Sequence, residues 1–174
     1  EVYLNCIKYA LTQGKGALVL VPEISLTPQT IGRFKSVLGE EAVVLHSKVS
    51  EGERQDAWEA LQNGQARVAI GVRSAIFAPV KNLGIIVIDE EHENTFKQSE
   101  PDPRYHARTV AMKRMENVGG VLLLGSATPS IDTYYQAQKG NFKLLELPER
   151  INKKALPKIE IIDMREELQK GNKS

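Results

Sequence analysis

The sequence predicts an α/β domain with a mostly parallel sheet and helices on both of its faces. Short apolar runs alternate with amphipathic segments along the chain, which is the order expected of βαβ units. Several runs are continuously apolar, as in residues 17–21, and such runs suit strands that are buried on both faces. Polar motifs follow directly after four of the runs, where the ligand sites of parallel sheets lie.

The expected helices combine helical spacing of apolar residues with recognisable ends. In the second helix Pro28 suits the first turn. Ser50 and Glu53 match a capping box that starts the third helix, and Gly64 follows its last residue. We expect Trp58 of this helix to lie in the core. The expected helices cover residues 1–13, 27–37, 50–63, about 106–117 and about 130–139.

The expected strands are short apolar runs that end at polar or turn residues. Pro22 ends the first of them, because proline cannot donate to the ladder of a central strand. The expected strands cover residues 17–21, 42–45, 67–70, 84–88 and 121–124. Residues 159–164 are either a further strand or the start of another domain, and residues 165–174 are expected to be frayed.

Composition limits the classes of protein to which the chain can belong. Its 174 residues fit one domain, and its net charge of +1 argues against a basic nucleic-acid-binding tail but not against a local basic patch. A single cysteine, Cys6, excludes an internal disulfide and a cysteine-based zinc site. No apolar stretch approaches the ~20 residues of a membrane helix. The first residues lack a signal-peptide pattern and look instead like a chain cut inside a helix. No membrane partner is expected.

The most informative motif follows the fourth expected strand and contains Asp89, Glu90 and His92. Phosphoryl transfer from ATP needs a metal ion and a group that orients the attacking water. An Asp at the tip of a rigid strand suits Mg²⁺ bound with ATP, and the next carboxylate suits the water. A solvated acidic turn is the alternative for an isolated Asp-Glu pair. The preceding strand and the following histidine favour a catalytic role for all three residues, with Asp89 and Glu90 as the metal ligands.

A second motif of small hydroxyl residues follows the fifth expected strand and contains Ser126, Ala127 and Thr128. Such hydroxyls can hydrogen-bond an acidic loop on the neighbouring strand and sense its state. They can also cap the following helix, with Pro129 in its first turn, and both roles are compatible.

Two further loops combine helix starts with polar side chains that suit the phosphates of a nucleic-acid backbone. Either loop alone is equally well explained as an ordinary connection from a strand to a helix. The residues of these loops that we expect to contact DNA are Pro22, Ser25, Thr27, Arg73 and Ser74.

The segment 96–108 mixes aromatic rings with cations, and its prolines mark a loop. Aromatic side chains stack on unpaired bases, and cations follow phosphates. The alternative is a surface loop whose aromatic side chains pack on the domain. The departure of the segment directly from the acidic motif favours DNA binding through Phe96, Lys97, Arg104, Tyr105, His106 and Arg108.

In their order these motifs, DEEH, GSATPS, LVPEISLTPQ and GVRSAIFAP, resemble those of the DEAH/DEEH-box helicases of superfamily 2. The match is closest to the bacterial helicases that restart stalled replication forks. The resemblance covers residues 1 to about 167 and implies the first of two RecA-like motor domains of an ATP-dependent 3′-to-5′ DNA helicase. It also implies coupling roles for His92, Ser126, Ala127 and Thr128, and a cytoplasmic bacterial location. The implied partners are single-stranded and forked DNA, single-strand-binding protein and other primosome proteins.

The chain departs from the family pattern in its phosphate-binding loop. A GxxxxGK[ST] motif is absent, and Lys15 is followed by Gly16 rather than by Ser or Thr. We therefore expect a P-loop NTPase fold without its P-loop, with a RecA-like domain at 1–150 and a linker or second motor domain from 151 to 174. Any zinc site is expected outside this chain. The expectation is that the chain alone is inactive; the alternative is a non-catalytic nucleic-acid-binding or interaction module.

Overall fold

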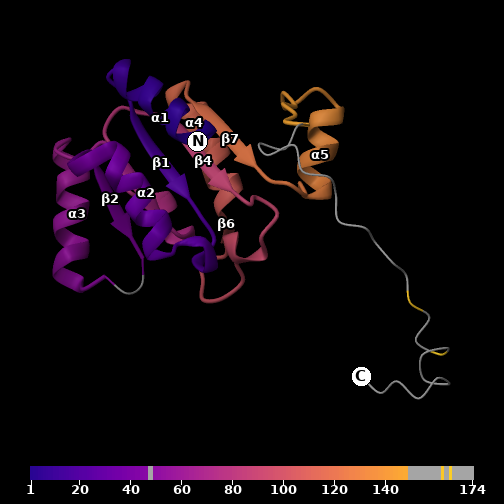
Figure 1. The fold of residues 1–174 in the computed structure, drawn as a ribbon, viewed down its shortest axis with the longest axis horizontal. Helices are drawn as coiled ribbons and strands as arrows, with labels where there is room; N and C mark the ends of the chain where they lie inside the picture. The colour runs from indigo at the N-terminus through magenta and orange to yellow at the C-terminus, as the bar shows by residue number, and fades with distance from the viewer. Residues whose placement is uncertain (47–48, 149–161, 163–164, 166–174) are drawn as a thin grey trace.

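The structure is a computed structural model that describes residues 1–46, 49–148, 162 and 165 (Figure 1). Its α-helices are α1 (Val2–Thr12), α2 (Pro28–Leu38), α3 (Glu51–Asn63), α4 (Ala107–Val118) and α5 (Ile131–Gln138). Its strands are β1 (Gly16–Leu20), β2 (Ala42–Leu45), β3 (Val68–Gly71), β4 (Leu83–Asp89), β5 (Lys97–Gln98), β6 (Tyr105–His106) and β7 (Val121–Gly125). Short 3₁₀ turns form η1 (Glu23–Ser25), η2 (Gly39–Glu41), η3 (Arg73–Phe77) and η4 (Asn94–Phe96).

A five-stranded sheet in the order β2-β3-β1-β4-β7 forms the centre of the domain. Each neighbouring pair is parallel. Helices α2, α3 and α4 lie in the connections from β1 to β2, β2 to β3 and β4 to β7, whereas only the 3₁₀ turn η3 lies between β3 and β4. Strands β5 and β6 form a separate antiparallel pair. The predicted α/β class with a mostly parallel sheet is therefore confirmed.

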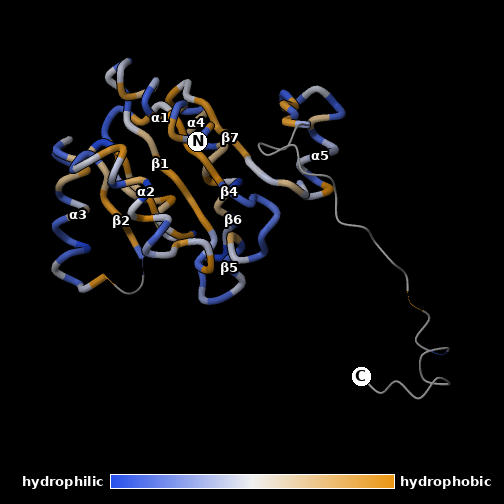
Figure 2. Tube along the Cα trace, in the orientation of Figure 1, coloured by the Kyte–Doolittle hydropathy of each residue, from blue (hydrophilic) through white to orange (hydrophobic). Residues whose placement is uncertain are grey.

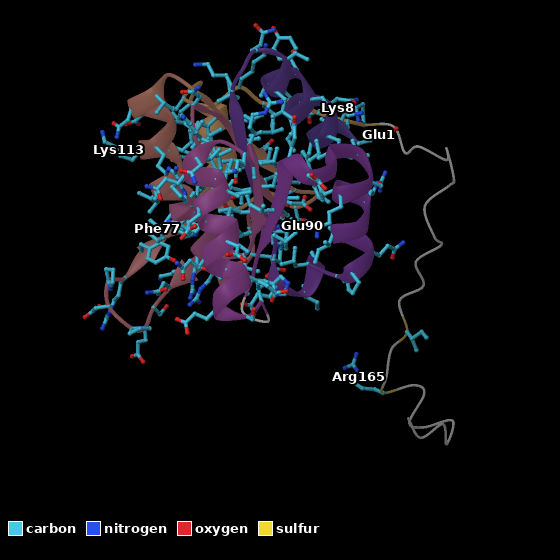
Figure 3. The ribbon with its side chains drawn as sticks, turned by 90° about the vertical axis from the view of Figure 1, so that its left-hand side faces the viewer. Glu1, Lys8, Phe77, Glu90, Lys113 and Arg165 are labelled. Carbon is cyan, nitrogen blue, oxygen red and sulfur yellow. The ribbon has the colours of Figure 1, made fainter. Side chains whose placement is uncertain are left out.

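Alternating side chains of the central strands supply two separate cores, one on each face of the sheet. Leu18 and Leu20 of β1 belong to the core that contains residues of α3 and α4. Ala17 and Val19 belong to the core that contains residues of α1 and α2. Figure 3 shows Lys8 of α1 and Lys113 of α4 on opposite sides of the sheet. In Figure 2 the central strands are apolar along their length, which reflects their burial on both faces.

Local signals in the sequence set several helix ends. The amide of Glu53 donates to the Ser50 hydroxyl at 3.3 Å, and the amide of Ser50 donates to the Glu53 carboxylate at 3.0 Å. This reciprocal pair confirms the predicted capping box. Gly64 ends α3 with φ of 81°, a left-handed conformation that glycine adopts without steric cost. The start of α2 also agrees, since Thr27 caps it and Pro28 opens its first turn.

Two expectations about packing and local structure are wrong. Trp58 is 37% exposed rather than in the core, because α3 packs on the sheet through another side, on which Leu61 is its one buried residue. The segment expected as a plain loop contains the β5–β6 hairpin, in which Pro101 and Pro103 occupy the turn and leave the ladder residues free to pair.

The expected features of residues 159–164 and of the last ten residues fall almost wholly outside the described part of the chain. Within the described part, none of the helices is both long and apolar enough to span a bilayer.

Candidate ATP and DNA site

Four polar loops meet along the carboxyl edge of the sheet. The parallel register aligns the last residues of neighbouring strands, so that Leu20 pairs with both Gly71 and Ile88. Asp89 in turn pairs with Gly125. The loops that follow β1, β3, β4 and β7 therefore leave the sheet at the same edge, as the sequence predicts.

Asp89 is held at this edge by a partner from the start of the chain. The hydroxyl of Tyr3 on α1 donates a hydrogen bond of 2.8 Å to Oδ1 of Asp89. Burial raises the pKa of Tyr3 far above its usual value, and the carboxylates of Asp89 and Glu90 raise it further. The hydroxyl therefore stays protonated and remains a donor at neutral pH. Gly125 makes room for the ring, because a Cβ there would lie 1.7 Å from the Tyr3 hydroxyl oxygen.

The backbone turns sharply immediately after Asp89. Glu90 has φ of 48°, a left-handed conformation that costs a non-glycine residue about 1 kcal/mol. This turn lets the amide of Glu93 donate to the Glu90 carbonyl at 2.9 Å. The turn directs Glu90 and His92 toward the loop after β7. Both remain only half-buried, so a ligand has access to them.

Ser126 connects the acidic loop to the loop after β7. Its hydroxyl oxygen lies 2.8 Å from Nδ1 of His92 and 3.5 Å from a carboxylate oxygen of Glu90. The amide of Thr128 also donates to this oxygen, at 2.9 Å. The structure thus brings together His92, Glu90 and the first and last residues of the predicted coupling motif. Ala127 lies between them and is exposed.

A groove of about 310 Å³ lies beside Asp89 on the α1–α2 face of the sheet. Tyr3, Ser25, Gln29, Arg33 and Asp89 are among the residues that line it. The groove combines the carboxylates of Glu1 and Asp89, one guanidinium and several neutral donors, which suits a polar ligand bound together with a cation.

The carboxylates at this edge suit Mg²⁺ that is also bound by water and phosphate, rather than a metal ion coordinated only by protein side chains. Among the described residues, no group of three or more His, Cys, Asp and Glu side chains could hold a metal ion. Magnesium usually binds one or two carboxylates, with waters and phosphate oxygens completing its coordination. Asp89 and Glu90 supply two carboxylates of this kind.

Glu91 faces away from this site and is 2% exposed. It receives hydrogen bonds from the Ser130 amide at 2.7 Å, from the Thr133 hydroxyl at 2.9 Å and from the Arg108 guanidinium at 2.7 Å. Burial by itself would raise the pKa of Glu91, but these donors outweigh it and hold the pKa below its usual range. Arg108, expected to contact DNA, thus has an internal partner, and its side chain is only 17% exposed.

The aromatic-rich segment divides into a buried start and an exposed hairpin. Phe96 is 1% exposed and belongs to the core on the α4 face. Its ring is therefore covered by protein, and direct stacking of Phe96 on a base does not fit this placement. Lys97 and Arg104 are exposed, and Arg104 forms a surface ion pair with Asp102 at 3.1 Å.

Tyr105 and His106 form the second strand of the hairpin and remain partly accessible. Tyr105 packs edge-to-face against Phe77, with ring centroids 5.1 Å apart, and Figure 3 shows Phe77 at the surface. His106 caps α4 by accepting the Arg108 amide at its Nδ1, at 3.2 Å. Burial lowers the pKa of His106, and the charge of Arg108 lowers it further.

The other loop residues expected to contact DNA differ in accessibility. Pro22 is buried, Ser25 is half-buried, and Thr27 is exposed although its hydroxyl accepts the Thr30 amide as the cap of α2. Ser74 is exposed. The neighbouring Arg73 turns inward, because its guanidinium donates to the Lys97 carbonyl at 3.0 Å and lies over the Tyr105 ring at 6.0 Å.

Comparison with known protein families decides the identity of this arrangement. The DEAD/DEAH box helicase model matches residues 2–137. The chain belongs to the DEAD/DEAH box helicase family. This helicase chain is 51% identical over its whole length to the replication restart protein PriA of Bacillus subtilis, and it spans 22% of that relative's length.

Solved structures agree with the fold. The helicase chain superposes on the C-terminal domain of Saccharomyces cerevisiae Dbp5 with a TM-score of 0.55, at 16% identity, over 82% of this chain and 81% of that one. It superposes on the DUF1998 helicase MrfA with a TM-score of 0.51, at 20% identity, over 75% of this chain and 20% of that one. The predicted RecA-like helicase fold is confirmed.

Sequence reasoning missed three residues that shape the site of this helicase domain. Tyr3 was unremarkable on an amphipathic helix, and Glu91 was one carboxylate among three. Nothing in the residues next to Gly125 indicates why glycine is needed at this position. Each acquires its role through a contact between distant parts of the chain, such as the 86 residues that separate Tyr3 from Asp89. Local patterns carry no signal for such contacts.

Proposed function

We propose that this chain is the first motor domain of an ATP-dependent 3′-to-5′ DNA helicase that remodels branched DNA during replication restart. The observation that carries the proposal is the hydrogen-bonded link from Glu90 and His92 through Ser126 to the loop after β7. Such a link suits a motor, because it would carry a change in the acidic loop to the loop after β7. The similarity to PriA supports the biological setting.

In this proposal Asp89 and Glu90 form the nucleotide side of the site. Mg²⁺ bound with ATP would neutralise charge on the phosphates, with Asp89 and Glu90 as its protein ligands. Tyr3 holds Asp89 in orientation through its hydroxyl. Glu90 also accepts a proton from the attacking water or orients it. His92 and Ser126 pass a change in this loop to Ala127 and Thr128.

The DNA side of the site combines neutral and charged groups. Ser25, Thr27 and Ser74 would donate to backbone phosphates along the carboxyl edge. Lys97 and Arg104 on the hairpin would follow phosphates, while Tyr105 and His106 would offer partly exposed rings to unpaired bases. We further propose that the parent protein acts in the bacterial cytoplasm with single-strand-binding protein and other primosome proteins. Any zinc that it holds would lie outside this chain, which has one cysteine.

The test is ATP hydrolysis by the full-length protein with and without forked DNA. Glu90→Gln should lower the rate of hydrolysis about a hundredfold or more, because it removes the group that activates water. The control is Glu40→Gln, which makes the same change at an exposed position far from the site. DNA binding without ATP hydrolysis by the wild-type protein would instead support a non-catalytic module.

The 174-residue chain itself should show no ATPase activity. It contains no GxxxxGK[ST] motif, whose backbone amides and lysine hold the phosphates in P-loop enzymes. Robust DNA-dependent hydrolysis by the purified chain would contradict this expectation.

A further inference from the structure

Glu91 is the buried member of the acidic loop. Its side chain is 1% exposed, whereas the neighbouring Glu90 and His92 side chains are 41% and 32% exposed. The left-handed turn at Glu90 separates the directions of these side chains. The loop therefore has two sides, with one accessible to nucleotide and the other closed inside the protein.

The donors to Glu91 come from two segments that follow other predicted motifs. Arg108 lies in the first turn of α4, two residues after the hairpin residue His106. Ser130 and Thr133 lie at the start of α5, directly after the predicted coupling motif. Arg108 also donates to the Ser130 hydroxyl at 2.8 Å and to the Thr133 hydroxyl, so the four side chains form one closed network.

This network anchors the start of α5 through hydrogen bonds to Ser130 and Thr133. No residue of α5 is buried, and Ile131, Tyr134 and Tyr135 are strongly exposed. Figure 1 shows α5 standing away from the body of the domain, at the end of the segment that leaves β7. Since apolar burial contributes little here, the hydrogen bonds to Glu91 set where the start of α5 lies.

A buried carboxylate tolerates little change in its partners. Removing one member of a buried charge pair leaves the other charge uncompensated, and such changes are strongly destabilising. Arg108 is suited to this role, because its guanidinium is planar and always charged, and it presents several donors in fixed directions.

We propose that Glu91 is a positioning residue that joins the nucleotide loop to both the DNA-side hairpin and the segment 126–133, and that Arg108 acts inside this link rather than on DNA phosphate. The inference rests on the proposed helicase function. Movement of the hairpin would reach Arg108 through the start of α4, and Glu91 would pass it to Glu90 and to Ser130. The link therefore complements the contact between His92 and Ser126 on the open side of the loop.

The test uses Glu91→Gln in the full-length protein, with two readouts. The first is hydrogen exchange of the amides in residues 126–133, which should become about tenfold or more faster because a charge-assisted anchor is lost. The second is steady-state ATP hydrolysis. The maximal DNA-stimulated rate should fall about tenfold, while the KM for ATP and the Kd for single-stranded DNA change less than about twofold. A purely structural role would not divide the kinetic constants in this way.

Matched variants isolate the link. Glu116→Gln makes the same change in an exposed surface pair with Lys113 and should alter neither readout. Arg108→Lys should reproduce Glu91→Gln without weakening DNA binding, and Arg54→Lys is its exposed control. If Glu91→Gln does not fold, Thr133→Val removes one donor at nearly constant volume and should shift both readouts in the same direction.

The outcomes separate the inference from the function on which it rests. Unchanged exchange in residues 126–133 would overturn the link. A weaker DNA affinity in Arg108→Lys than in Arg54→Lys would show that Arg108 contacts phosphate and would overturn its assigned role. If the wild-type protein shows no DNA-stimulated hydrolysis, the proposed function fails, and exchange alone then decides whether Glu91 anchors α5.

Discussion

The hydroxyl of Tyr3 donates a hydrogen bond of 2.8 Å to Oδ1 of Asp89 and so joins the first helix to the tip of the central strand β4. One carboxylate oxygen of Asp89 is therefore already engaged before any ligand binds. The other oxygen keeps a defined direction, because the tyrosine ring is packed against Gly125. The orientation of the expected metal ligand thus depends on two residues outside its own loop.

Removing the Tyr3 hydroxyl should destabilise the domain. Tyr3→Phe keeps the ring but leaves Asp89 without its donor, which should lower the free energy of unfolding by about 1–2 kcal/mol. The midpoint of urea unfolding measures the change. Tyr9→Phe, at a position that is 69% exposed, is the control and should leave the midpoint in place. Equal midpoints for the two variants would show that the bond to Asp89 contributes nothing to stability.

Gly125→Ala should destabilise through overpacking. The added Cβ would meet the Tyr3 hydroxyl oxygen at 1.7 Å and Cζ at 2.7 Å, and a rigid ring cannot move aside without disturbing Asp89. The expected loss is about 1–3 kcal/mol in the free energy of unfolding.

Two further variants check this explanation of Gly125. In Gly125→Ala combined with Tyr3→Ala, the measured loss should be smaller than the sum of the single losses, because the clash is gone. Gly52→Ala lies in helix α3 with open space around it, so it should be neutral or stabilising by about 0.5–1 kcal/mol. Strict additivity at Gly125 and Tyr3 would contradict a direct clash.

Arg73 should hold the hairpin in place rather than remain free for a ligand. Arg73→Ala removes the donor to the Lys97 carbonyl and the cation over the Tyr105 ring. Trypsin cleavage after Lys97 and Arg104 should then become about tenfold faster, because the hairpin opens more often. Arg54→Ala, on the exposed face of α3, should leave the cleavage rate unchanged. Equal resistance of the hairpin to trypsin in both variants would show that Arg73 does not hold the hairpin in place.

His106 should make stability fall in mild acid. Its pKa is lowered in the folded state, first by burial and then by the charge of Arg108, so the unfolded chain binds a proton more readily. The contribution to stability is therefore fully present above the ordinary pKa of 6.5 and is lost as pH falls through the lower folded value. The carboxylate of Glu91 raises the pKa of His106 and the charge of Lys97 lowers it. Both effects are smaller than that of burial.

Urea unfolding between pH 7.5 and pH 5 tests this dependence. His106→Asn keeps a side-chain acceptor at the start of α4 and removes the titrating group, so its stability should vary less with pH in this range. The same slope in His106→Asn and in the wild type would assign the pH dependence to other groups.

Much of the fold could be predicted from the sequence because its signals are local. The continuous apolar run of β1, the capping box at Ser50 and the glycine after α3 each depend on a few neighbouring residues. Parallel pairing then follows from the alternation of strands and helices. Trp58 shows the limit of such reasoning, since helical spacing identifies a face but not how far that face is covered.

The candidate site divides in the same way. Asp89, Glu90 and His92 were predicted from one short motif, and the structure places Glu90 and His92 at Ser126. Segment 96–108 was singled out by its composition, but the structure divides it between η4, the β5–β6 hairpin and the start of α4, and its members differ in accessibility. Phe96 lies in the core, and Arg108 donates to Glu91. The sequence could not predict these placements, because composition does not tell on which side of a turn a side chain will lie.

The sequence by itself determined the strands and helices, their parallel pairing and the chemistry available at the ends of the strands. It did so because backbone propensity, apolar periodicity and capping are encoded within a few residues of each other. Only the tertiary structure decided which of those groups face a ligand and which face the protein. That choice rests on contacts such as Tyr3 with Asp89 and Glu91 with Arg108, whose partners are brought together by the packing of separate elements.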